Sequence, residues 1–98
     1  MKHTETELEK TCCLIARQYG LAAVKIEKTG HKGIPDRLFV KQGGRTLFVE
    51  FKRPDGKGRA TREQRTWSEY LGEAHRFIDS AQEFYQCICE YFGYVPKL

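Results

Sequence analysis

The sequence predicts an α/β domain whose elements follow the order α-β-β-β-α-β-α. Apolar residues recur at helical spacing near both ends of the chain, and short runs rich in β-branched and aromatic residues lie between them. Gly43 and Gly44 separate two such runs and suit a hairpin turn, because glycine tolerates the positive φ that this turn requires. Another helical segment precedes the last strand, which predicts a β-α-β crossover and therefore a parallel pair of strands.

The first predicted helix ends at about Tyr19, and either Thr4 or Thr6 can provide its N-cap. One face of this helix is apolar, as indicated by the spacing of Leu8, Cys12, Ile15 and Tyr19. Glu5 lies near the middle of this face, and Glu9 lies at its edge.

Three strands are expected next. Residues 21–28 predict the first strand, residues 36–41 the second and residues 46–52 the third. Because the hairpin turn joins the second strand to the third, we expect an antiparallel meander. The third strand carries apolar residues on both faces, so it should be central in the sheet and covered on both sides.

The second helix is expected to begin after Thr61, because Gln64 follows three positions later at the spacing of a capping box. Trp67 and Leu71 lie on its predicted buried side, and Gly72 ends the helix or weakens its last turn.

Residues 75–79 predict the fourth strand, parallel to the third. The last helix should begin after Ser80, which with Glu83 repeats the capping-box spacing, and should end at Gly93.

Length and composition fit one domain over residues 1–98 with a single hydrophobic core. No apolar run approaches the ~20 residues that span a bilayer, and no signal peptide is visible. We therefore expect a cytoplasmic protein, in the host cytoplasm if its source is viral, without membrane association. The cysteines form no C-x-x-C pair, so we expect buried thiols rather than a zinc site or disulfide; they are Cys12, Cys13, Cys87 and Cys89.

The residues that flank the hairpin have the chemistry of a metal-dependent phosphodiesterase. Asp36 opens the second strand, and Glu50 and Lys52 end the third, where their spacing places both side chains on one face. Carboxylates are oxygen ligands that Mg²⁺ or Mn²⁺ prefers, and the Phe51 carbonyl can add another. Lys52 would orient the attacking water or stabilise developing negative charge. Taken alone, Glu-x-Lys is more often a cross-strand ion pair, and Pro-Asp is more often a turn.

Basic residues are concentrated around this segment, although the net charge of the chain is only +4. A solvated surface accounts for most isolated basic runs, but beside two carboxylates the pattern favours a nucleic-acid ligand. We expect phosphate contacts from Lys25, Lys32, Arg53, Lys57, Arg59 and Arg62, with Lys28 and His31 nearby. Phosphate contacts carry no base-sequence information, so we expect structure-selective cutting.

Two sequence blocks surround the candidate residues, Gly33-Ile34-Pro35-Asp36-Arg37-Leu38 and Val49-Glu50-Phe51-Lys52-Arg53-Pro54, and Gln64 follows them. In these blocks the chain resembles the VRR-NUC (virus-type replication-repair nuclease) group of the PD-(D/E)XK nuclease superfamily. The resemblance extends from the first helix to the last and implies a restriction-endonuclease-like core with a mixed four-stranded sheet flanked by helices. It also implies that Asp36 and Glu50 are metal ligands and that Lys52 is the catalytic lysine.

The same resemblance assigns two further residues. Gln64 matches a glutamine of the family that would support the site or contact the DNA backbone, although the capping box alone also explains it. The family places a glutamate on the first helix; Glu9 fits this position best, and Glu5 is the alternative.

We therefore predict a Mg²⁺- or Mn²⁺-dependent endodeoxyribonuclease that acts on branched or duplex DNA, such as Holliday junctions, in DNA repair. Symmetric cleavage of a four-way junction requires two sites, so a homodimer is expected. Its interface could include Tyr91, Tyr94 and Val95, unless these residues close the core. Two alternatives stay open, a non-catalytic DNA-binding or assembly module that retains the fold and a sequence-specific restriction-type enzyme.

Overall fold

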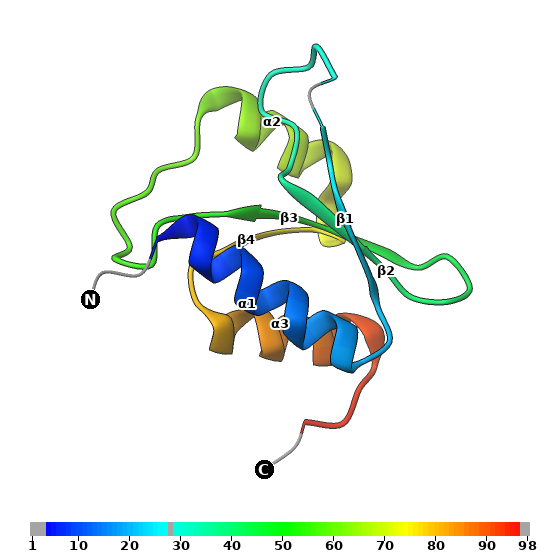
Figure 1. The fold of residues 1–98 in the computed structure, drawn as a ribbon. Helices are drawn as coiled ribbons and strands as arrows, with labels where there is room; N and C mark the ends of the chain where they lie inside the picture. The colour runs from blue at the N-terminus through cyan, green and yellow to red at the C-terminus, as the bar shows by residue number, and fades with distance from the viewer. Residues whose placement is uncertain (1–3, 28, 97–98) are drawn as a thin grey trace.

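A mixed β-sheet with the strand order β1-β2-β3-β4 forms the middle layer of the protein (Figure 1). The structure is a computed structural model that describes residues 4–27 and 29–96. Its helices and strands, with one short 3₁₀ turn η1, are α1 (Glu5–Gln18), β1 (Ala22–Lys25), β2 (Arg37–Val40), β3 (Thr46–Phe51), α2 (Arg62–Leu71), η1 (Gly72–Ala74), β4 (His75–Ile78) and α3 (Ala81–Phe92). The predicted α/β class and element order are confirmed.

Strands β1, β2 and β3 form the predicted antiparallel meander, and β4 runs parallel to β3. The hairpin between β2 and β3 turns at Gly43 and Gly44, whose φ angles are both 107°. A hydrogen bond from the Lys41 N–H to the Arg45 carbonyl, 2.9 Å long, closes the turn. The hairpin brings the start of β2 beside the end of β3, which positions the candidate site.

Helices α1 and α3 lie on one side of the sheet and enclose the hydrophobic core (Figure 1). Leu47, Val49 and Phe51 alternate along β3 and are each at most 2% exposed. Burial of one such side chain stabilises the fold by about 1.5–3 kcal/mol. All four cysteines are buried free thiols, as predicted. Burial raises the pKa of Cys12 to about 12, which makes its reactive thiolate form unfavourable.

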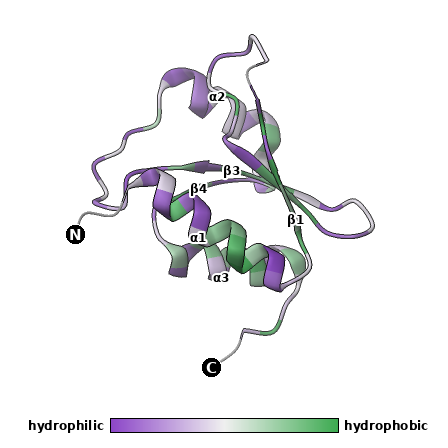
Figure 2. Ribbon diagram, viewed as in Figure 1, coloured by the Kyte–Doolittle hydropathy of each residue, from purple (hydrophilic) through white to green (hydrophobic). Residues whose placement is uncertain are grey.

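The other face of the sheet is covered less completely than the sequence predicts. Helix α2 lies on that side (Figure 1), but most of its residues are hydrophilic (Figure 2) and none of them is buried. Trp67 and Leu71, expected on a buried side, are only half-buried, as is Phe48 of β3. The reason is that α2 contacts the sheet partly through polar side chains: Gln64 of the helix is hydrogen-bonded to Glu50 and Lys52.

The predicted N-caps are present. The Thr4 side chain accepts a hydrogen bond from the Glu7 N–H, the Ser80 side chain caps α3, and Thr61 and Gln64 form a complete capping box. Strand β1 is shorter than expected, and Lys28 lies outside the described residues. No helix in the described part of the chain is both long enough and apolar enough to cross a membrane.

Two of the three residues considered for a dimer interface pack against the core instead. Tyr91 and Tyr94 are half-buried, and their hydroxyls donate to the carbonyls of Thr46 and Tyr19. Val95 is 85% exposed. Of the three, Val95 is therefore the most exposed.

Candidate active site

Asp36 lies directly before β2 and is hydrogen-bonded to the end of β3. The preceding Pro35 is fully buried and fixes the backbone at this point. One carboxylate oxygen of Asp36, Oδ2, accepts a hydrogen bond of 2.8 Å from the Phe51 N–H. Glu50 is the neighbouring residue on β3 and is only 6% exposed. The hairpin therefore places two carboxyl groups from different strands side by side.

Gln64 connects the buried carboxylate to the candidate catalytic lysine. Its Nε2 donates to Glu50 Oε2 at 3.0 Å, and its Oε1 accepts from Lys52 Nζ at 2.5 Å. The same Oε1 accepts from the Thr61 N–H at 3.0 Å, which is half of the capping box. Gln64 thus takes part in the capping box of α2 and contacts the candidate site at the same time.

The electrostatics of the acidic pair depend on burial and on mutual repulsion. Burial raises the pKa of Glu50 to about 8, and the charge of Asp36 adds to the shift. Burial also raises the pKa of Asp36, while the hydrogen bond from Phe51 opposes that shift. The positive charge of Lys52 lowers the pKa of both acids, which indicates that all three groups share one location.

Lys52 follows β3 directly and is half-buried. Besides its bond to Gln64, its ammonium donates to the Arg59 carbonyl at 3.3 Å and lies 5.9 Å from the centre of the Phe77 ring. These contacts hold the end of a flexible side chain in place, which favours a positioned charge over a solvated surface lysine.

Both candidate acids of α1 approach the site. Glu9 forms an ion pair with Arg37, whose Nε lies 2.5 Å from Glu9 Oε2. The charge of Glu9 raises the pKa of Asp36, and the charge of Glu5 raises the pKa of Glu50. Arg37 is not among the residues predicted for the site. Its position directly after Asp36 was the available signal, but nothing in the sequence pairs it with α1.

The acidic pair fits a hard divalent cation. Two desolvated carboxylates within hydrogen-bonding reach of each other repel when both are charged, and a cation between them would relieve that repulsion. Within residues 4–27 and 29–96, no group of three or more His, Cys, Asp or Glu side chains is arranged to hold a metal. The site therefore suits an ion that keeps several waters, as Mg²⁺ does, rather than a fully protein-coordinated metal such as structural zinc.

The six basic residues expected to contact phosphates occupy more than one surface. Lys25 is on the edge strand β1, while Lys32 and Arg62 line a hollow beside α2. Arg53 and Lys57 line an open groove of about 950 Å³ with the N-terminal turn of α1. Arg59 is exposed, and Arg53 pairs with Asp55, which partly neutralises it.

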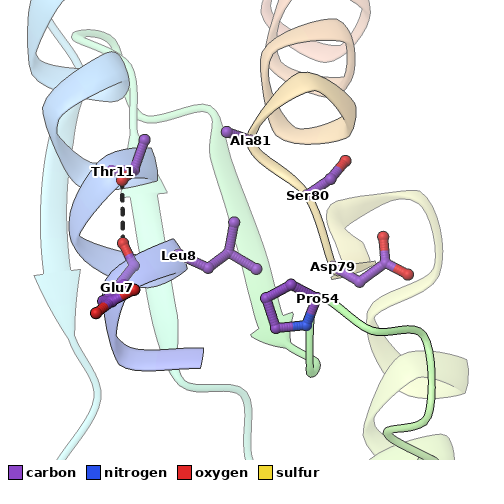
Figure 3. Close-up of a pocket in the computed structure, with 7 residues that line it drawn as sticks. All are labelled: Glu7, Leu8, Thr11, Pro54, Asp79, Ser80 and Ala81. Carbon is purple, nitrogen blue, oxygen red and sulfur yellow. Dashed lines mark hydrogen bonds between the residues drawn. The ribbon is translucent and has the colours of Figure 1, made fainter. Parts of the chain in front are cut away.

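A separate pocket of about 300 Å³ lies between α1, Pro54 and the start of α3. Figure 3 shows Leu8 and Pro54 projecting into its centre, with Asp79 on the far side and the Thr11 hydroxyl bonded to the Glu7 carbonyl. None of Asp36, Glu50, Lys52 and Gln64 lines this pocket.

The fold and site together define an α/β protein with a carboxylate pair, a lysine and a glutamine at one end of a mixed sheet. No protein-family model matches the chain. A segment of 53 residues, or 54% of the chain, is 38% identical to a protein named "Putative nuclease p44" of Acyrthosiphon pisum secondary endosymbiont phage 1. The match covers 57% of that protein, so the chain spans little more than half the length of this curated relative.

Proposed function

We propose that this protein is a metal-dependent endonuclease of the VRR-NUC type that hydrolyses DNA phosphodiester bonds. The observation that carries the proposal is the convergence of Asp36, Glu50 and Lys52, with Gln64 of α2 bonded to both Glu50 and Lys52. Similarity to a phage protein named as a nuclease supports the class in general. A buried pair of acids beside a lysine costs folding free energy, and groups perturbed in this way gather at functional sites, which disfavours a non-catalytic role.

Asp36, Glu50 and the carbonyl of Phe51 would hold a Mg²⁺ or Mn²⁺ ion. When bound, that ion supplies neutralising charge at the phosphate and lowers the pKa of a coordinated water. The chain itself contributes the arrangement of the ligands, because the Phe51 N–H fixes Asp36 and Gln64 fixes Glu50.

Lys52 would act directly on the reacting groups. Its ammonium is a compact charge with three donors, and Gln64 together with the Arg59 carbonyl holds it close to the acids. From that position it can orient the attacking water or stabilise negative charge on the phosphate oxygens. Glu9, or alternatively Glu5, would add negative charge from α1 to the metal-binding side.

Branched DNA, such as a Holliday junction, is the proposed substrate in DNA repair. The scattered basic residues suit contacts to phosphates on several strands, and such contacts weaken as the salt concentration rises. Two cuts in a four-way junction would require a homodimer, and exposed Val95 marks one place to look for its interface. A cytoplasmic location is proposed with this activity.

A panel of end-labelled DNA structures tests the proposal. Purified protein is incubated with four-way junctions, forks, flaps, duplex and single strands in Mg²⁺, in Mn²⁺ and in EDTA. We expect internal cuts in branched substrates with either metal and none in EDTA. Metal-independent cutting would overturn the mechanism, and salt-sensitive binding without cutting of any substrate would support the non-catalytic module instead.

A further inference from the structure

Three aromatic side chains gather at α2 and at the loop that precedes β2, and we name them the aromatic surface: His31, Trp67 and Tyr70. The His31 and Trp67 rings meet edge to face at 5.9 Å between centroids, and the Trp67 and Tyr70 rings are 6.1 Å apart. Tyr70 is 81% exposed. Because no residue of α2 is buried, core packing does not account for these rings.

The orientation of the central ring is fixed. Trp67 Nε1 donates to the Lys32 carbonyl at 3.2 Å, which ties the indole to the loop before β2. A held indole beside an exposed phenol offers ring faces to a ligand at a low entropic cost. An aromatic side chain in this state is suited to stacking against a flat partner.

Basic groups adjoin the aromatic surface. Lys32, Arg62 and Trp67 line one hollow of about 150 Å³ together with Thr66 and one acid, Glu63. This volume is well below the ~300 Å³ of the smallest typical small-molecule pockets, so it suits a single ring rather than a whole compact ligand. Rings that accept stacking beside cations that attract phosphates are the combination that binds single-stranded nucleic acid.

The aromatic surface is directly connected to the candidate active site. Trp67 follows Gln64 by one turn of α2, and Gln64 contacts both Glu50 and Lys52. The loop packs tightly on the same turn, since a Cβ at Gly33 would lie 2.6 Å from the Gln64 backbone nitrogen. A strand held on the aromatic surface would therefore lead into the site.

We propose that the aromatic surface binds unpaired nucleotides by base stacking and so directs the enzyme to junctions between paired and unpaired DNA. This inference rests on the proposed nuclease function for its substrate. Stacking is tolerant of base identity because every base has a ring face, so the surface selects unpaired structure rather than sequence.

The chain contains one tryptophan, which makes Trp67 a built-in reporter. Full-length Lys52→Ala protein is used in EDTA so that no DNA is cut during the measurement. It is titrated with an oligothymidylate of about 12 nucleotides and with a duplex of equal length. We expect the single strand to quench the tryptophan fluorescence at lower concentration than the duplex. Oligouridylate is the third ligand, and quenching by it at lower concentration than by oligothymidylate would overturn the assignment of the surface to unpaired DNA.

Tyr70 provides the decisive variant, because replacement of so exposed a side chain should leave the fold intact, and a loss of binding would then reflect the lost ring. Tyr70→Ala should weaken single-strand binding by about fivefold or more and leave duplex binding unchanged, whereas Tyr70→Phe should retain the affinity. Leu14→Ala, at a position that is 60% exposed on α1, is the matched control and should change neither. Equal quenching by duplex and single strands, or unchanged affinity in Tyr70→Ala, would overturn the proposal. Because this readout requires no cleavage, it is independent of whether the nuclease proposal fails.

Discussion

Replacement of Gln64 by alanine is expected to reduce the cleavage rate more than its effect on stability explains. The amide joins Glu50 to Lys52 through bonds of 3.0 and 2.5 Å, and both partners are charged groups at the proposed reaction centre. A hydrogen bond to a charged group contributes about 1.5–3 kcal/mol. Loss of one such contribution from the transition state lowers kcat by about 10- to 150-fold, because ~1.4 kcal/mol is a factor of ten.

Thr61→Ala is the matched control for this variant. It removes the hydroxyl that accepts from the Gln64 N–H at 3.1 Å, but it leaves the Gln64 side chain in place. Loss of an N-cap destabilises a protein by about 1 kcal/mol, so both variants should lose stability in urea titrations. Single-turnover cleavage at saturating DNA and Mg²⁺ separates them. Equal rates in the two variants would show that Gln64 only caps the helix.

Three further outcomes follow from the geometry. In urea titrations, Gly33→Ala should destabilise the protein by several kcal/mol and Gly30→Ala by about 1–2 kcal/mol. Both glycines have positive φ, but of the two only Gly33 would place a Cβ against backbone, 2.4 Å from the Glu63 carbonyl carbon. Similar losses of stability in the two variants would contradict this packing. In EDTA, the free energy of unfolding should fall as pH rises from about 5 to about 8, by up to ~1.4 kcal/mol per pH unit. The reason is that folded Glu50, with a pKa of about 8, keeps a proton over this range that the unfolded chain has lost. Glu50→Gln should flatten that slope in the same urea titrations, and a rising slope in the unaltered protein would refute the burial argument. Asp36→Ala should weaken Mn²⁺ binding in calorimetry, and unchanged affinity would exclude Asp36 as a ligand.

The arrangement of the sheet and of the acidic pair could be predicted because both depend on local signals. Glycines at the hairpin set the turn, and a short turn sets the register, so Arg37 had to lie opposite Val49 and Asp36 had to lie near the end of β3. Likewise, the spacing between Thr61 and Gln64 was enough to place the start of α2.

The remaining features depend on how elements pack, which periodicity does not encode. The pattern of α2 indicates an apolar side but not its depth, so half-buried Trp67 was expected to be more deeply covered than it is. The Glu9–Arg37 ion pair joins residues from α1 and β2, and the sequence shows no feature that pairs them. The contact between Gln64 and Glu50 similarly requires that α2 lie over the sheet, which only the structure establishes.

A pair of lysine variants tests whether Lys52 and the two carboxylates beside it perform the chemistry. Lys52→Ala and Lys57→Ala each remove one positive charge from the segment that follows β3, but the ammonium of Lys52 is bonded to Gln64 whereas Lys57 is exposed in the loop. Both proteins are assayed for DNA binding and for Mg²⁺-dependent cleavage of the best substrate in the panel. Lys52→Ala should bind DNA and fail to cut it, while Lys57→Ala should cut at a near-normal rate once DNA is saturating. Cleavage by Lys52→Ala at the rate of the unaltered protein would exclude Lys52 as the catalytic lysine.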